Sequence, residues 1–350
     1  MPRLKRVLFL LLLSSTAIVR AQKAGLNYEI ARWQGNKQAA VSITLDDCIP
    51  SQFENAIPVL NDPFRKISVT FFLTGKSVSK NVSAVKQAYL AGHELANHSF
   101  THPAKLADLP AVKIESELKE CQDAIFKLFN KRLAYTMAYP NGSGQGNEAK
   151  DLNLRAILKR YAIGARATQI NPSRINEYFW EAPFTDDSYY KVNSAMIGEG
   201  FTVEDFAGDL NKVITKGGWY CATYHGIGSG WIVTSTALFT SHMDEVVKRK
   251  DQLWIATFRD VIAYHKERNS AKLTALKESK HKWKLSLIDT LSDDNAFNVP
   301  LTIRMHTVGS NIKSVTQNGM RLSYKVHLDT LQFDAAPNKG NVVIRKSLKR

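Results

Sequence analysis

Short apolar runs alternate with longer stretches of helical periodicity between residues 40 and 270. The runs are rich in β-branched and aromatic residues, which predicts buried strands at 40–45, 67–73, 94–97, 133–139, 162–165, 219–224 and 253–257. Apolar residues at helical spacing predict helices at 82–90, 112–129, 152–161, 203–214, 234–248 and 258–268. Repeated strand–helix units are typical of an α/β protein with a parallel sheet, and about seven units favour closure into a (β/α) barrel.

The pattern changes after about residue 272, where apolar and polar positions alternate in short runs. Such alternation predicts half-buried strands, here at 283–288, 301–306, 322–328 and 342–344. Turn sequences such as Asn318-Gly319 separate them. We therefore expect residues 273–350 to form a small antiparallel β domain. This domain could bind carbohydrate or could simply cover the barrel, and the sequence leaves both roles open.

The N-terminal residues have the pattern of an export signal. Basic residues at positions 3, 5 and 6 precede the apolar run 7–13, and the stretch ends at Val19-Arg20-Ala21. This pattern predicts a signal peptide over 1–21 and a secreted or periplasmic location. The barrel domain is then expected over 22–272. An uncleaved anchor is the alternative, although the run is too short to span a bilayer. No later segment approaches 18 consecutive apolar residues, so we expect no integral membrane segment after cleavage.

The 350-residue chain carries 47 Lys and Arg against 32 Asp and Glu, a formal charge of +15. The surplus favours polyanionic surroundings, with a merely solvated surface as the alternative. The basic residues are dispersed without an interleaved aromatic stripe, so no nucleic-acid partner is expected. The cysteines at 48, 121 and 221 permit at most one disulfide and leave its pairing open. A cysteine zinc knot is excluded because the chain has no CxxC pair.

Three polar segments follow predicted strands at their carboxyl ends, where active sites of barrel proteins collect. Asp46 and Asp47 close the first strand, His98 and His102 follow the third, and His225 follows a later one. Two histidines and a carboxylate with open positions suit a catalytic divalent metal, Zn²⁺ or alternatively Co²⁺ or Fe²⁺. The third histidine is a candidate general acid. Helix capping by the carboxylates and simple packing of the histidines are the structural alternatives.

The order of these segments resembles the polysaccharide deacetylase family with the NodB homology domain (carbohydrate esterase family 4). The matching segments are Thr44-Leu45-Asp46-Asp47, His98-Ser99-Phe100-Thr101-His102, Ala138-Tyr139-Pro140-Asn141-Gly142 and Tyr224-His225-Gly226. The resemblance covers residues 40 to about 265 and implies a distorted (β/α) barrel of about seven strands. It also implies a hydrolase that removes acetyl groups from an N-acetylated polysaccharide, either peptidoglycan or a chitin-like glycan.

The resemblance also implies a role for each site residue. The implied metal ligands are Asp47, His98 and His102. Asp46 would be the base toward the attacking water, and His225 would protonate the leaving amine. Asn141 would offer its backbone N–H to the oxyanion, because Pro140 has no N–H to give.

Two departures from the family pattern affect this site. Cys48 stands where the family usually has glycine, and we expect it to be a buried filler rather than a ligand. Ala138 stands where the family often has an arginine that pairs with the base. A carboxylate without a neighbouring cation is harder to ionise. Arg166, at the end of the next predicted strand, is our hypothesis for the missing cation, with a surface arginine as the alternative.

Two aromatic residues near the strand ends, Trp231 and Tyr139, are candidates for a sugar-binding platform. A core position is the alternative for each. Two other functions also fit the sequence. One is an O-acetyl esterase that acts on xylan or another polysaccharide, and the other is a non-catalytic carbohydrate-binding homologue.

Overall fold

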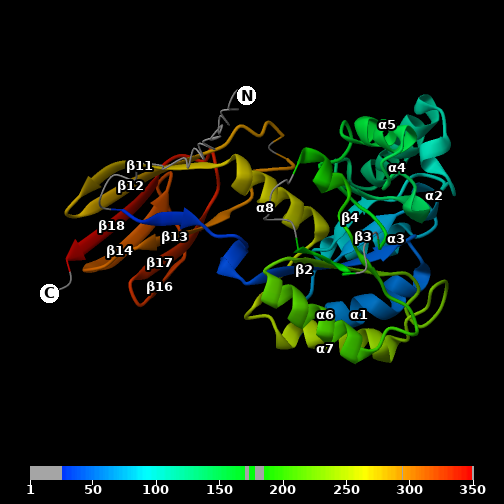
Figure 1. Ribbon diagram of the computed structural model, residues 1–350, viewed down its shortest axis with the longest axis horizontal. Coiled ribbons are helices and arrows are strands. Elements are labelled where there is room, and N and C mark those ends of the chain that lie inside the picture. The colour runs from blue at the N-terminus through cyan, green and yellow to red at the C-terminus, as the bar shows by residue number, and fades with distance from the viewer. Residues whose placement is uncertain (1–25, 170–172, 178–184, 294, 349–350) are drawn as a thin grey trace, which may run out of the picture.

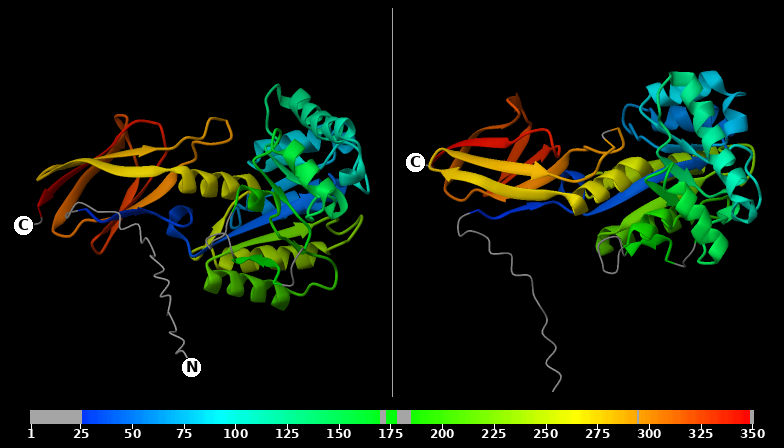
Figure 2. Two further views of the ribbon diagram at one scale, coloured as in Figure 1. Left: turned by 45° about the horizontal axis from the view of Figure 1, so that its top comes forward. Right: turned by 90° about the horizontal axis from the view of Figure 1, so that it is seen from above.

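The molecule has two bodies, an α/β body and a β-rich body, joined through helix α8 (Phe258–Ser270) and the chain between β1 (Tyr28–Ile30) and β2 (Ala39–Asp46) (Figure 1). The computed structural model describes residues 26–169, 173–177, 185–293 and 295–348. The two bodies lie at opposite ends of the molecule in both further views (Figure 2). The predicted signal peptide over 1–21 lies outside the described residues.

A curled, mainly parallel sheet forms the centre of the α/β body. Its strand order is β6-β5-β4-β3-β2-β9-β7, with β10 also paired to β2 and β8 to β9. All of these pairings are parallel except that of β7 with β9. Besides β2, the strands are β3 (Thr70–Leu73), β4 (Glu94–Asn97), β5 (Thr136–Ala138), β6 (Gly164–Arg166), β7 (Ile175–Asn176), β8 (Ala195–Met196), β9 (Trp219–Tyr224) and β10 (Leu253–Ile255). The predicted distorted (β/α) barrel is confirmed.

Strand β2 lies at the centre of this sheet and is buried on both faces. All eight of its residues are buried, which is the pattern of a parallel strand covered on both sides. Two apolar clusters pack against the faces of the sheet. Since β2 ends in Asp46, the central strand carries the first polar side chain of the site to the carboxyl edge of the sheet.

Helices cover the outer side of the curled sheet (Figure 1). Besides α8 they are α1 (Ile57–Leu60), α2 (Gly75–Val78), α3 (Val82–Leu90), α4 (Ala111–Phe129), α5 (Ala149–Leu158), α6 (Val203–Lys216) and α7 (Thr236–Lys248). The longest, α4, buries Ile114, Leu118 and Ile125 at helical spacing. It ends at Asn130, whose left-handed backbone (φ 49°) is typical of a helix C-terminus. None of the helices in the described ranges combines the length and the apolar character that crossing a bilayer needs.

The predicted C-terminal β domain is confirmed as two antiparallel sheets that share one apolar core. The first sheet has the order β1-β13-β17-β16 and the second β11-β12-β18-β14-β15. The strands are β11 (Lys272–Ser279), β12 (Lys282–Ile288), β13 (Leu301–His306), β14 (Ser310–Gln317), β15 (Met320–Arg321), β16 (Tyr324–His327), β17 (Thr330–Ala335) and β18 (Val342–Leu348). The expected turn at Asn318-Gly319 joins β14 to β15, and both of its residues have positive φ.

The sequence pattern did not predict that β1 belongs to the β-rich body. Tyr28 pairs with Met305, so this N-terminal strand completes the four-stranded sheet. The strand expected over 133–139 is also shorter, because only Thr136–Ala138 pairs with neighbours. The chain therefore starts in the β-rich body, builds the α/β body and then returns.

Candidate metal centre and active site

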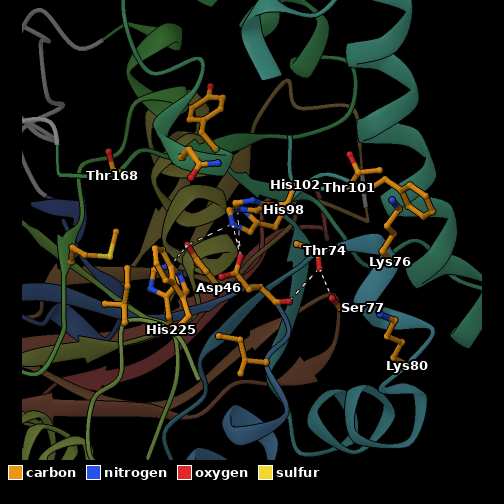
Figure 3. Close-up of a pocket in the computed structure, with 18 residues that line it drawn as sticks. Asp46, Thr74, Lys76, Ser77, Lys80, His98, Thr101, His102, Thr168 and His225 are labelled. Atoms are coloured by element: carbon orange, nitrogen blue, oxygen red, sulfur yellow. Dashed lines mark hydrogen bonds and ion pairs between the residues drawn. The ribbon is translucent and has the colours of Figure 1, made fainter. Parts of the chain in front are cut away.

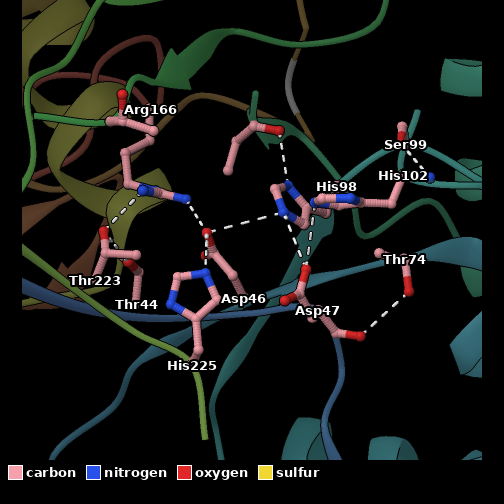
Figure 4. Close-up of polar contacts among 12 residues, drawn as sticks. Thr44, Asp46, Asp47, Thr74, His98, Ser99, His102, Arg166, Thr223 and His225 are labelled. Carbon is pink, nitrogen blue, oxygen red and sulfur yellow. Dashed lines mark hydrogen bonds and ion pairs between the residues drawn. The ribbon is translucent and has the colours of Figure 1, made fainter. Parts of the chain in front are cut away.

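The turn after β2 presents two adjacent carboxylates. Asp46 is the last strand residue, and its side chain is almost fully buried. Asp47 and Cys48 both have left-handed backbones, with φ of 80° and 62°, which is uncommon for residues other than glycine. The Asp47 N–H donates to Phe72 O on the next strand (3.1 Å), which fixes the turn. Both carboxylates therefore reach the pocket from one short segment (Figure 4).

The thiol of Cys48 is buried and does not line the pocket. Burial comes first among the causes that raise its pKa to about 12, so the thiol stays protonated at neutral pH. Cys48, Cys121 and Cys221 are all buried and free of disulfides.

A tight loop after β4 carries the two histidines. Ser99 and His102 have left-handed backbones (φ 63° and 58°), which turns the four-residue spacing into a loop instead of a helix. Glu117 on α4 anchors the loop by accepting hydrogen bonds from the N–H groups of Phe100 (2.9 Å) and Thr101 (2.8 Å). The His98 Nδ1 lies 2.9 Å from Ala138 O, which leaves Nε2 directed at the carboxylates.

The structure brings Asp47, His98 and His102 together. The Nε2 atoms of both histidines lie 3.4 Å from Asp47 Oδ1 (Figure 4). One ligand atom from each of the three residues lies within 4.8 Å of the others. One carboxylate and two imidazoles converging on one point fit a divalent metal of the zinc type.

Electrostatics in this cluster favour an ionised Asp47 carboxylate next to a protonated His98 imidazole. Burial opposes ionisation of Asp47, but the hydrogen bond to His98 and the nearby imidazoles outweigh it and lower the pKa of Asp47. Burial likewise opposes protonation of His98, yet Asp46 and Asp47 together raise its pKa. The cluster therefore attracts positive charge, whether from a proton or from a metal ion.

Arg166 contacts the other carboxylate. Its Nη2 donates to Asp46 Oδ2, and both side chains are at most 4% exposed. Its Nη1 donates to Thr223 Oγ1 (2.7 Å) and Ser194 Oγ (3.2 Å), and the guanidinium lies 5.2 Å above the Phe72 ring. Arg166 is therefore a buried arginine at the site, and Ala138 is adjacent to it as a strand partner.

His225 lies on the other side of Asp46, directly after β9. Its Nε2 is 4.0 Å from Asp46 Oδ2. Its Nδ1 is buried and makes no hydrogen bond to any described residue. Burial is the main cause that lowers the pKa of His225. The side-chain amide of Gln52 ties the two strand ends together by donating to the carbonyls of Asp46 (2.5 Å) and His225 (2.9 Å).

A pocket of about 660 Å³ is lined by Asp46, Asp47, His98, His102 and His225 (Figure 3). Trp231 is 61% exposed at its rim, with its ring edge-on to His225 at 6.3 Å between centroids. Asn141 also lines the pocket with a left-handed backbone (φ 51°), and its N–H makes no hydrogen bond to another described residue. Tyr139 is only 1% exposed, and its hydroxyl donates to Tyr190 O (3.0 Å). Tyr139 lines the pocket but is almost fully enclosed, so its role as a sugar-binding residue stays a prediction.

Several pocket residues had no signal in the sequence motifs. The pocket is also lined by Thr74, Lys76, Ser77 and Lys80, which follow β3. Gln52 and Glu117 organise the site from outside the pocket lining. Only the position of Thr74 directly after a predicted strand could have drawn attention to this segment.

Comparison with known proteins identifies relatives of the chain. The sequence model described as polysaccharide deacetylase matches residues 34–161. A gellan lyase from a Bacillus species is 26% identical over 343 residues, which cover 90% of this chain and 13% of the relative. The peptidoglycan-N-acetylmuramic acid deacetylase PdaA of Bacillus subtilis is 30% identical over 116 residues, which cover 32% of this chain and 42% of the relative. The chain thus spans less than half the length of either relative.

One solved structure supports the fold. A putative polysaccharide deacetylase from Mycobacterium smegmatis matches with a TM-score of 0.50 at 14% identity. The match covers 72% of this chain and 98% of that chain. At this identity the likeness concerns the barrel architecture alone.

Proposed function

We propose, from the premise that residues 34–161 belong to the polysaccharide deacetylase family, that this protein is a secreted, metal-dependent hydrolase. It removes acetyl groups from an N-acetylated polysaccharide, either peptidoglycan or a chitin-like glycan. One observation carries the proposal: Asp47, His98 and His102 converge within 4.8 Å beside the Asp46 carboxylate. A single pocket thus joins a metal-type donor set with a separate base.

In this proposal Asp47, His98 and His102 hold a divalent ion, with Zn²⁺ favoured over Co²⁺ or Fe²⁺. A bound ion acts as a Lewis acid toward the acetyl carbonyl and lowers the pKa of a water beside it. Asp46 takes the proton of the attacking water. Arg166 holds the Asp46 carboxylate in place, because its Nη2 donates to Asp46 Oδ2 and the pair is buried together.

His225 delivers a proton to the nitrogen of the leaving amine. Its position beside Asp46 but outside the donor set suits this role, and its lowered pKa makes it a readier acid once protonated. The N–H of Asn141 donates to the oxyanion that forms from the acetyl carbonyl. Trp231, exposed at the rim, offers a ring on which a sugar can stack.

Acetate release tests this function. The chain from residue 22 is incubated with chitooligosaccharide, peptidoglycan and acetylated xylan, each with EDTA and with Zn²⁺ or Co²⁺ restored. We expect release from an N-acetylated substrate, loss with EDTA and recovery with metal. Asp46→Asn keeps the shape of the side chain but removes the base, and we expect about 10²-fold or greater loss of kcat.

Each other result has a definite meaning. Release from xylan alone contradicts the amide substrate and favours the esterase. Tight metal binding without release from any substrate contradicts the hydrolase. Metal-independent release contradicts the assigned donor set.

A further inference from the structure

Two lysines line the catalytic pocket on the side away from His225. Lys76 belongs to α2, and Lys80 follows that helix by two residues. Both are exposed, and neither has an ion pair with another described residue. Figure 3 shows them grouped with Ser77 and Thr101 across the pocket from His225. Their charges therefore face the solvent-filled space that a substrate enters.

A second hollow of about 570 Å³ adjoins the catalytic pocket at these lysines. Lys76, Lys80 and Phe100 line both hollows, and Lys127 on α4 lines the second. Among the residues lining either hollow, the acids are the two carboxylates at the catalytic site. The two hollows thus adjoin at Lys76, Lys80 and Phe100, and we call the space around these residues the basic groove.

The basic part is held rigidly against the catalytic loops. The N–H groups of Gly75 and Lys76 donate to the carbonyls of Ser99 and Phe100, each at 3.0 Å. Thr74 Oγ1 lies 3.2 Å from the Asp47 carbonyl oxygen and 2.8 Å from Ser77 Oγ. A Cβ on Gly75 would lie 2.3 Å from Phe100 Cδ2, so glycine is needed for this close contact. The position of α2 is therefore fixed relative to both catalytic loops.

We propose that this basic groove is a subsite for a carboxylate-bearing sugar next to the acetylated one. The ammonium groups of Lys76 and Lys80 pair with the carboxylate, and Lys127 extends the positive field. Phe100 and the aliphatic stems of the lysines cover the apolar face of the sugar. The carboxylate belongs to a uronic acid or to a lactyl ether of the muramic type. This inference rests on the proposed function for the identity of the neighbouring sugar.

Direct binding tests the subsite without requiring turnover. Isothermal titration calorimetry compares three oligosaccharides that contain N-acetylglucosamine: a neutral one, one that alternates with glucuronate and one that alternates with muramic acid. The protein is the wild type, the Lys76→Gln/Lys80→Gln double variant, or a Lys313→Gln/Lys325→Gln control that removes the same charge from exposed sites on β14 and β16.

We expect the wild type to bind at least one acidic oligosaccharide about tenfold more tightly than the neutral one, which corresponds to about 1.4 kcal/mol. The double variant loses this preference while its affinity for the neutral ligand stays within about twofold, and the control keeps the preference. The preference also shrinks between about 50 and about 300 mM salt. Preference for one acidic ligand identifies the source of the carboxylate.

Equal binding of neutral and acidic ligands by the wild type overturns the subsite. Equal loss for all ligands in the double variant overturns it too, because the lysines would then serve the fold alone. Acid-selective binding without acetate release contradicts the proposed function and leaves the subsite intact. Acetate release without acid-selective binding overturns the subsite and leaves the proposed function intact.

Discussion

Asp46 and Arg166 place two opposite charges where water cannot screen them. Their side chains are 4% and 1% exposed, so each would be costly to bury without the other. Arg166 also donates to Thr223 and Ser194, which restricts its orientation. In many folds such a pair adds little net stability, because desolvation offsets attraction. We therefore interpret the pair as a contact that holds the Asp46 carboxylate in one orientation.

Arg166→Ala should lower activity, because it leaves the buried Asp46 carboxylate without its partner. Without the guanidinium the Asp46 carboxylate loses the buried contact that orients it, so we expect the loss in kcat rather than in KM. We expect kcat to fall about 10²-fold at neutral pH, with Arg166→Lys restoring part of it. Acetate release measured over a range of substrate concentrations at one pH checks this. An unchanged kcat in Arg166→Ala would show that the base does not depend on this arginine.

The chemistry-bearing residues of the site could be predicted because they follow strands directly. Asp46, Asp47 and His225 each lie at the end of a β-branched or aromatic run, and topology brings such ends together. Gln52 could not be predicted, because its role depends on where a loop places an amide between two carbonyls. The burial of Tyr139 depends on contacts from residues about 50 positions away, which local sequence does not reveal.

At the scale of elements, the entry to β4 contains a histidine kept neutral by its surroundings. His93 is 3% exposed, its Nδ1 accepts from Val69 N (3.2 Å), and the Phe71 ring packs edge-on against it. Burial lowers its pKa from 6.5 to about 4. Below pH 6.5 His93 therefore binds a proton in the unfolded chain but stays neutral in the folded chain. The free energy of unfolding falls as pH falls toward 4.

His93→Asn should reduce this acid sensitivity. Asparagine can still accept from Val69 N but does not titrate. The wild type should lose about 3 kcal/mol of unfolding free energy more than the variant between pH 7.5 and 4. Urea unfolding at several pH values measures the difference, with exposed His327→Asn as control. Parallel pH profiles of wild type and His93→Asn would contradict a neutral buried imidazole.

Elements with one strongly apolar stripe or face were predictable, and others were not. Helix α4 was evident because its buried positions repeat at helical spacing. Strand β11 was missed because its residues are exposed or half-buried and show no clear apolar face. Its backbone pairing with β12 defines it as a strand. Strand β1 is three residues long and defined only by its distant partner.

At the scale of the whole molecule, a buried acid lies where α8 meets the β-rich body. Glu267 is fully buried, and the Asn298 N–H donates to its Oε1. Its Oε2 and the Oδ2 of Asp289 are both buried, and the two carboxyls are neighbours. Burial, and then the neighbouring Asp289 carboxyl, raise the pKa of Glu267 to about 8. The junction therefore holds a proton up to mildly basic pH.

Glu267→Gln should make the junction less sensitive to pH. The unfolded chain loses the Glu267 proton near pH 4.5, whereas the folded chain keeps it to about pH 8, so this group costs stability as pH rises between those values. The variant should therefore gain stability over the wild type on going from about pH 5 to about pH 8.5. Denaturant unfolding measures this gain, and exposed Glu54→Gln should show none. If the free energy of unfolding of Glu267→Gln falls relative to the wild type as pH rises, Glu267 is not protonated in the folded chain.

The pairing of β1 with β13 sets an order of events during synthesis. Tyr28 leaves the ribosome early, but its partner Met305 follows only after the whole α/β body has been made. At about 5–20 residues per second, the delay is roughly 14 to 55 s. During that interval the backbone groups of β1 have no strand partner, while the α/β body is already complete and can fold. Closing the N-terminal strand into its sheet is thus a late, long-range step, and the nascent chain carries an open edge until then.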